Sequence, residues 1–322
     1  MLRLLQSLFG GTTQGNYPES LVKAAIERAV DGTDPWLRAV SGYKRKLRPA
    51  VLRSIDHVVA MVDGLPSPMT ISRDNYGDDP RLKTFFISAD DMQKTFAREQ
   101  TLAAYLRGAN KTPQQVVALL AMEKHENTVL GNEMSGEIVR RDVPQVSVSF
   151  EAHRLIDPTG NEEETRWQLK RRAFDHLLSL ALMRISIVKS TRKELGRHRE
   201  LLQAKRNLLE RGGWGDFSKP DSTEKLDVAE VEELLAGIEA SLMELGGDDS
   251  MLEAYLNIVA DVLGHPEKYL WTTRETLIID RMGIKRDQSA FNIPELTLDE
   301  LFNAEGRRLV IALATLPGGV VG

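Results

Sequence analysis

The sequence contains no cysteine. Disulfide bonds, zinc sites with thiolate ligands, iron–sulfur clusters and a cysteine nucleophile are therefore excluded. A chain of 322 residues with 42% hydrophobic and 28% charged residues is long enough, and ordinary enough in composition, to bury a large core without such cross-links. Because a reducing compartment suits this composition, we expect a cytoplasmic protein.

Long hydrophobic runs are also lacking. No segment reaches the roughly 18 to 20 apolar residues that a membrane-spanning helix needs, and the best candidate, Leu177–Val188, is shorter and contains Arg184. We therefore predict no transmembrane segment. The opening stretch Leu2–Phe9 could place its apolar residues on one helical face, so two interpretations stay open: a foot on a membrane surface or a terminal helix tucked onto the body.

Sequence motifs for chemistry are missing as well. There is no phosphate-binding loop, nucleophile elbow, catalytic triad order or zinc-hydrolase spacing. The tightest group of potential metal ligands, Glu123–Glu126, fits a polar strand end better than a metal site. We predict no metal and no cofactor, we identify no catalytic residue, and we favour a protein that is not an enzyme.

The hydrophobic patterns predict an α+β fold that is mainly helical. Residues 1–112 have helical spacing, whereas residues 113–160 and 265–322 contain strand patterns, including the alternation of Val146, Val148 and Phe150. Two separated groups of strands most simply form one small antiparallel sheet or partial barrel. Residues 161–264 would then be an inserted, long antiparallel helical hairpin, and these three regions are the predicted domains.

The first helix of this hairpin should extend from about Arg166 to Arg211. Leu177–Val188 is apolar on every side and should be buried, and beyond Lys189 only a narrow leucine stripe remains. The second helix repeats apolar residues at spacings of three and four, which is typical of a coiled-coil seam: Val228, Val231, Leu235, Ile238, Leu242 and Leu245.

Charge differs sharply between the two predicted helices. The formal charge is +5 over residues 189–211 and −6 over residues 224–244. Opposite charges on consecutive helices suggest that the helices neutralise each other, although each exposed pair contributes only about 0 to 1 kcal/mol. Gly196 and Gly237 should lie nearly level, which would allow the two backbones to approach closely.

These features lead to a hypothesis with two alternatives. The leading one is a non-enzymatic interaction or scaffold protein of a larger cytoplasmic assembly, whose projecting hairpin binds a protein partner through Trp214 and Phe217 at its tip. The first alternative is a nucleic-acid-binding protein that uses the basic residues Arg192, Lys193, Arg197 and Arg199, which the net charge of −5 disfavours. The second is an enzyme with an unrecognised site between the sheet and the N-terminal helices.

Overall fold

The computed structural model describes residues 17–108, 113–135, 138–211, 222–245, 250–286, 293 and 295–318. The chain forms two compact units. The first, here called the sheet unit, is built mainly from Ile55–Phe174 and Pro266–Gly322, and the second, the helical unit, from Pro18–Ser54 and Asp175–His265. The three domains predicted from the sequence remain a prediction.

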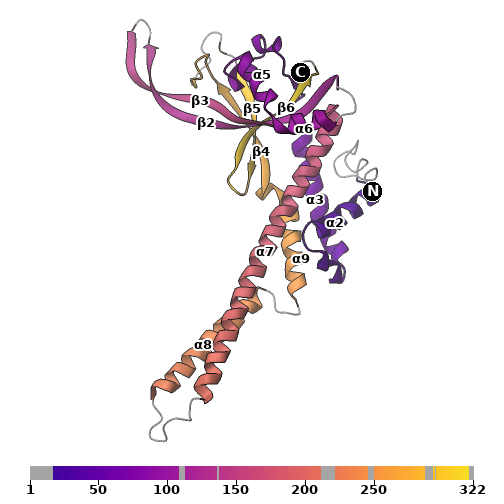
Figure 1. Ribbon diagram of the computed structural model, residues 1–322, viewed down its shortest axis with the longest axis vertical. Helices are drawn as coiled ribbons and strands as arrows, with labels where there is room; N and C mark the ends of the chain where they lie inside the picture. The colour runs from indigo at the N-terminus through magenta and orange to yellow at the C-terminus, as the bar shows by residue number, and fades with distance from the viewer. Residues whose placement is uncertain are drawn as a thin grey trace. The chain divides into compact units, whose positions relative to one another are not determined.

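The sheet unit contains an open sheet of six strands, in the order β3-β2-β6-β5-β4, with β1 beside β6 (Figure 1). Only the β1–β6 pair is parallel. The sheet therefore joins two separated stretches of chain in one antiparallel array, and the predicted α+β class is confirmed. The strands are β1 (Met69–Thr70), β2 (Gln115–Ser135), β3 (Ile138–Thr159), β4 (Leu270–Ile278), β5 (Glu295–Asn303) and β6 (Arg308–Pro317).

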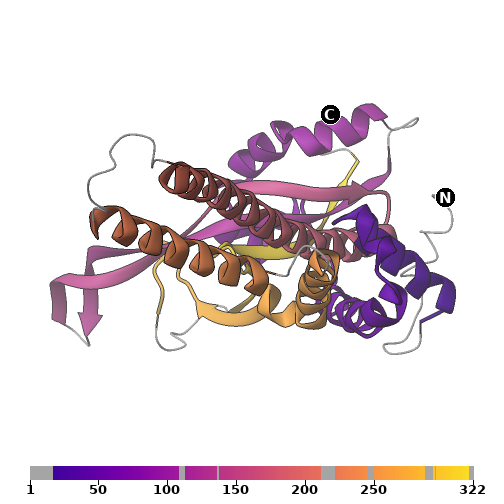
Figure 2. The same ribbon diagram turned by 90° about the horizontal axis from the view of Figure 1, so that it is seen from below.

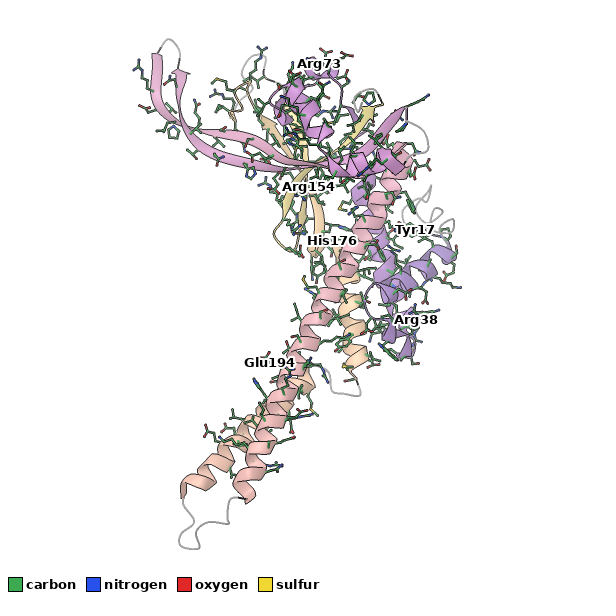
Figure 3. The ribbon with its side chains drawn as sticks, viewed as in Figure 1. Tyr17, Arg38, Arg73, Arg154, His176 and Glu194 are labelled. Carbon is green, nitrogen blue, oxygen red and sulfur yellow. The ribbon has the colours of Figure 1, made fainter. Side chains whose placement is uncertain are left out.

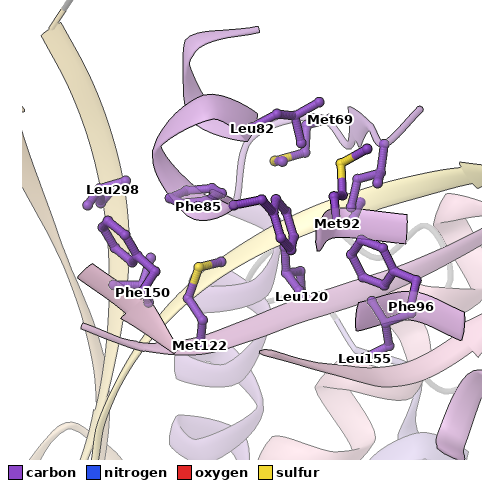
Figure 4. Close-up of a cluster of buried hydrophobic side chains, with 14 of the residues drawn as sticks. Met69, Leu82, Phe85, Met92, Phe96, Leu120, Met122, Phe150, Leu155 and Leu298 are labelled. Atoms are coloured by element: carbon purple, nitrogen blue, oxygen red, sulfur yellow. The ribbon is translucent and has the colours of Figure 1, made fainter. Parts of the chain in front are cut away.

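One face of the sheet packs against three short helices, α4 (Pro80–Phe85), α5 (Ala89–Ala97) and α6 (Gln100–Gly108). Alternate residues of β2 and β6 point into this core, together with Phe85 and Phe96 from the helices (Figure 4). Phe85 meets Phe150 edge to face at 5.1 Å. The predicted alternation in β3 is confirmed, since Val148 and Phe150 belong to this core and Val146 packs against it.

The opposite face of the sheet packs against the end of α3 (Tyr43–Asp63) and the beginning of α7 (Glu162–Arg211). The last carbonyl groups of a helix have no partner within the helix. Arg166 of α7 binds at this helix end, because its guanidinium donates to the carbonyl oxygen of Val62 in α3 at 2.6 Å and to that of Leu65, which follows the helix, at 2.9 Å. The sheet unit thus has a helical layer on each face.

Strand β3 contains three irregularities where its register with β2 shifts. Each has a non-glycine residue at positive φ: Asp142 at 56°, Ala152 at 53° and Asp157 at 50°. Extra residues of this kind bend and twist a strand pair. Beyond Met122, β2 pairs only with β3, so the two strands leave the sheet as a two-stranded ribbon (Figure 1).

The helical unit contains α2 (Glu19–Asp31), the short helix η1 (Pro35–Ala39), α8 (Ser222–Glu244) and α9 (Met251–Gly264), with parts of α3 and α7. Buried polar contacts fix its packing. Ser54 donates to the carbonyl oxygen of Leu263 at 2.7 Å, and Lys189 pairs with the buried carboxylate of Asp34 at 2.7 Å. Asp34 also caps η1 by accepting from the backbone of Trp36.

The prediction that Leu177–Val188 is buried on every side was wrong. Leu177 and Ile185 are fully buried, but Met183 is 44% exposed and Ile187 is 59% exposed. Residues four apart share one face of a helix, so Met183 and Ile187 lie together on the side of α7 that its neighbours leave uncovered. An apolar composition all around a helix does not ensure that every side has a packing partner.

Candidate functional site

The distal part of α7 and all of α8 lie side by side as an antiparallel hairpin, here called the hairpin (Figures 1 and 2). Glu194, labelled in Figure 3, lies on the part of α7 that belongs to it. The side chain of Arg192 donates to the carbonyl oxygen of Leu242 at 3.4 Å. Arg192 and Leu242 therefore lie at the same height along the paired helices. The antiparallel hairpin expected from the sequence is therefore present.

The seam between the helices is apolar on α8 and mixed on α7. Val231 and Leu235 of α8 are 1% and 6% exposed. On α7 the half-buried positions repeat at spacings of four and three, and apolar residues alternate there with arginines: Val188, Arg192, Leu195, Arg199, Leu202 and Arg206. Arginine at a seam position buries its methylene groups and carries its charge toward the rim. The coiled-coil geometry of this seam remains a prediction.

The four basic residues predicted as an anion or nucleic-acid contact do not share one surface. Arg192 and Arg199 are half-buried at seam positions, whereas Lys193 and Arg197 are exposed. The two predicted partner-binding aromatics, Trp214 and Phe217, lie outside the described residues.

The expected neutralisation of α7 by α8 is absent at several described residues. Lys193, Arg197, Arg199 and Lys205 of α7 form no ion pair with any described carboxylate. Four described acids of α8 likewise have no cationic partner among the described residues: Glu230, Glu232, Glu233 and Glu239. These basic residues and these acids therefore lie on different helices without a described ion-pair partner.

The close backbone approach that two level glycines would allow is not observed at Gly196 and Gly237. A Cβ atom added to Gly196 or Gly237 would meet no atom within 4 Å. The glycines are level, as Arg192 and Leu242 indicate, but both face open space. Large apolar side chains on the hairpin are open as well: Leu201 is 68%, Leu234 is 51% and Met243 is 79% exposed.

The sheet unit holds a second notable cluster, centred on Lys124 of β2, which the sequence reasoning missed. The side chain of Lys124 is 1% exposed, and its ammonium contacts Glu275, Glu300 at 2.9 Å and Glu126 at 3.2 Å. Arg308 closes the cluster, since it pairs with Glu300 at 2.7 Å. The sequence did contain one signal for this cluster. Side chains of a strand alternate between its two faces, and Lys124 falls on the same face as the buried residues Leu120 and Met122.

This cluster holds ionised groups. Burial alone would lower the pKa of Lys124, but the hydrogen bonds that its ammonium donates to the surrounding glutamates raise it on balance. Burial would likewise raise the pKa of Glu275, yet Lys124 lowers it. Lys124 is therefore a charged ammonium at neutral pH rather than a neutral nucleophile, and the cluster acts as a stabilising ion-pair network.

The sheet unit also has an open groove of about 890 Å³ lined by Pro66, Asn75, Asp78, Asp79, Pro80, Arg81, Arg274, Glu295, Leu296 and Thr297. Its cations already have partners, since Arg81 pairs with Asp79 at 2.7 Å and Arg274 with Asp299 at 2.8 Å. Burial would raise the pKa of Asp79, but Arg81 lowers it on balance, so this carboxylate stays ionised. The groove shows charges that are tied to each other rather than aimed at a substrate.

Among the residues that the structure describes, no three histidine, aspartate or glutamate side chains are grouped as a metal site would require. No helix within the described ranges combines the length and the apolar character that crossing a membrane requires.

Comparisons with protein-family models, with curated proteins and with solved structures found no match. Function must therefore be argued from the surfaces themselves.

Proposed function

We propose that this protein is a non-enzymatic interaction or scaffold component of a larger cytoplasmic assembly, and that the hairpin is its binding element. The observation that carries this proposal is the combination of unpaired charge and exposed apolar residues on one narrow element. Lys193 and Arg197 on α7 and Glu232 and Glu233 on α8 have no described ion-pair partner, and Leu201 is 68% exposed beside them. These residues together offer a partner apolar surface to bury and charges to pair.

A shortened hairpin tests this proposal. Because Gly196 and Gly237 lie level and face open space, the chain can be joined between them through a short flexible loop, which removes the distal part of both helices. Affinity capture with the full-length chain and with the shortened chain, followed by quantitative mass spectrometry, should show a set of partners that only the full-length chain retains. Equal recovery of every partner by both chains would contradict the proposal, provided that circular dichroism shows the shortened chain to lose only the helical content of the removed residues.

Nucleic-acid binding is a second candidate, because Lys193, Arg197 and Lys205 are exposed without a described carboxylate partner. The glutamates of α8 lie on the neighbouring helix and would repel a phosphate backbone, which favours a protein partner. Fluorescence anisotropy with single- and double-stranded oligonucleotides at about 50 and about 200 mM salt separates the two, since binding through phosphate contacts weakens by orders of magnitude over this range. Micromolar binding that collapses between the two salts would favour nucleic acid.

A further inference from the structure

The outer side of α7 carries an exposed row of residues spaced four apart: Lys193, Arg197, Leu201 and Lys205. Such i, i+4 rows form the ridges with which helices pack against each other. Arg197 lies two residues from each of the seam residues Leu195 and Arg199, so it points away from α8. This row, here called the basic ridge, contains the 68% exposed Leu201 between its charges.

The outer side of α8 carries a row with the same spacing and the opposite charge: Glu232, Ala236, Ala240 and Glu244, all exposed. Ala240 lies two residues from each of the seam residues Ile238 and Leu242, so this row, the acidic ridge, also points away from the seam. Alanines between its two glutamates leave room for a large side chain. The two ridges therefore occupy opposite outer edges of one hairpin.

The two ridges match in length as well as in charge. The end charges Lys193 and Lys205 are separated by the same number of residues as Glu232 and Glu244, which corresponds to about 18 Å of helix. In an antiparallel arrangement Lys193 meets Glu244 while Lys205 meets Glu232. Leu201 then lies over the alanines, where its exposed surface is buried.

We infer that the basic ridge of one chain binds the acidic ridge of a second copy of the same chain. This inference rests on the proposed role of the hairpin as a binding element and names its partner. Within one hairpin, Arg192 of α7 lies level with Leu242 of α8. If a second hairpin is placed beside the first at the same height, a shift of three residues along the helix axis, about 4.5 Å, brings the oppositely charged ends of the two ridges together. The association is head to tail, because the ridges lie on opposite edges, and it generates a ring or an open row of hairpins.

Charge reversal tests the inference in the full-length chain. The first variant, Lys193→Glu with Lys205→Glu, makes both ridges acidic, and the second, Glu232→Lys with Glu244→Lys, makes both basic. A third chain with all four substitutions exchanges the two charges and restores complementarity. The matched control, Lys83→Glu with Lys94→Glu, reverses two exposed lysines of the sheet unit.

Sedimentation velocity gives the readout. At about 50 mM salt, where charge is weakly screened, the average mass of the wild type and of the control should rise with concentration above the 36.0 kDa of one chain and pass the mass of a dimer. Each double variant should remain at 36.0 kDa, with an association at least about tenfold weaker. An equimolar mixture of the two double variants, and the fourfold variant alone, should regain the wild-type behaviour.

Three results would overturn the inference. The first is a wild type that stays at 36.0 kDa throughout, and the second is a closed dimer that does not grow with concentration. The third is an association that nuclease treatment abolishes, since nucleic acid would then bridge the chains. A monomeric wild type whose shortened hairpin still loses captured partners would refute only self-association, whereas a shortened hairpin that loses none would refute the proposed function.

Discussion

Removing the ammonium of Lys124 is the sharpest test of how the sheet unit is stabilised. Its side chain is 1% exposed, and Glu300, which it contacts at 2.9 Å, is 3% exposed. Taking such a pair out of water is costly, and the geometry must repay that cost. Removal of one partner leaves the other charge buried without compensation. The loss in the free energy of unfolding is then larger than the net stabilisation that the intact pair provides.

Lys124→Met keeps the length of the side chain while removing its charge. Breaking a buried ion pair in this way costs about 3 to 5 kcal/mol. Glu300 keeps three hydrogen bonds from Arg308, at 2.7, 2.8 and 3.1 Å, so we expect the lower end of that range, about 3 kcal/mol. Lys285→Met is the matched control, because Lys285 is 33% exposed and lies 3.5 Å from Glu275, and an exposed pair is worth about 0 to 1 kcal/mol.

Urea denaturation followed by circular dichroism measures both variants, and amide hydrogen exchange in β2 and β6 reports on the sheet unit separately. A loss for Lys124→Met no larger than that for Lys285→Met would refute the idea that burial decides the strength of this network. The same result would follow if water entered the cluster and solvated Glu300 once the ammonium was gone.

The pH dependence of the same variant follows from the two pKa shifts. The pKa of Glu275 is lowered from 4.5, so its contribution is present above pH 4.5 and is lost as the pH falls through the lower, folded value. The pKa of Lys124 is raised from 10.5, so its contribution is complete below pH 10.5 and is lost as the pH rises further. The stability difference between the wild type and Lys124→Met should therefore be constant between these limits and shrink outside them. A difference that changes across neutral pH would contradict this assignment.

Four further substitutions test local features, and Arg172→Met serves as a control for one of them. Gly196→Ala and Gly237→Ala should each raise the thermal stability of the hairpin, by about 1 kcal/mol, because a Cβ fits freely and alanine favours a helix; destabilisation would restore the close-contact interpretation. Ala152→Gly should stabilise the sheet unit by about 1 kcal/mol in urea, since φ is 53° at this residue, and a loss of stability would show that no strain is present. Arg166→Met should cost about 1 to 3 kcal/mol by removing the hydrogen bonds that the guanidinium donates to the carbonyl oxygens of Val62 and Leu65, whereas Arg172→Met, which removes an exposed pair, should cost less than about 1 kcal/mol.

Periodicity was sufficient to predict the fold class. The alternation of Val146, Val148 and Phe150 follows directly from the period of a half-buried strand, and the spacing from Val231 to Leu242 follows from that of a helix with one buried stripe. Both patterns reflect the burial of one face, which local sequence encodes. The described hairpin and sheet agree with these patterns.

The irregularities of β3 could not be predicted in the same way. Positive φ usually signals glycine, but Asp142, Ala152 and Asp157 adopt it here, and the sequence carries no turn signal at Ala152. The Lys124 network was equally inaccessible, because two of its three glutamates, Glu275 and Glu300, come from β4 and β5. These residues meet only when the sheet order is known, and order is a property of the whole fold.

Charge composition did not reveal which residues of the hairpin can pair with each other, for a geometric reason. Two packed helices lie about 8 to 10 Å apart, so only residues that flank the seam can reach across it. Arg197 and Ala240 each lie two residues from their nearest seam positions and point outward, and the charges of the two outer ridges are separated by both helices. Opposite charges on the outer edges of a two-helix element can be satisfied only by water or by another molecule. The segregation of charge along this chain is therefore better explained by contacts between hairpins than by contacts within one.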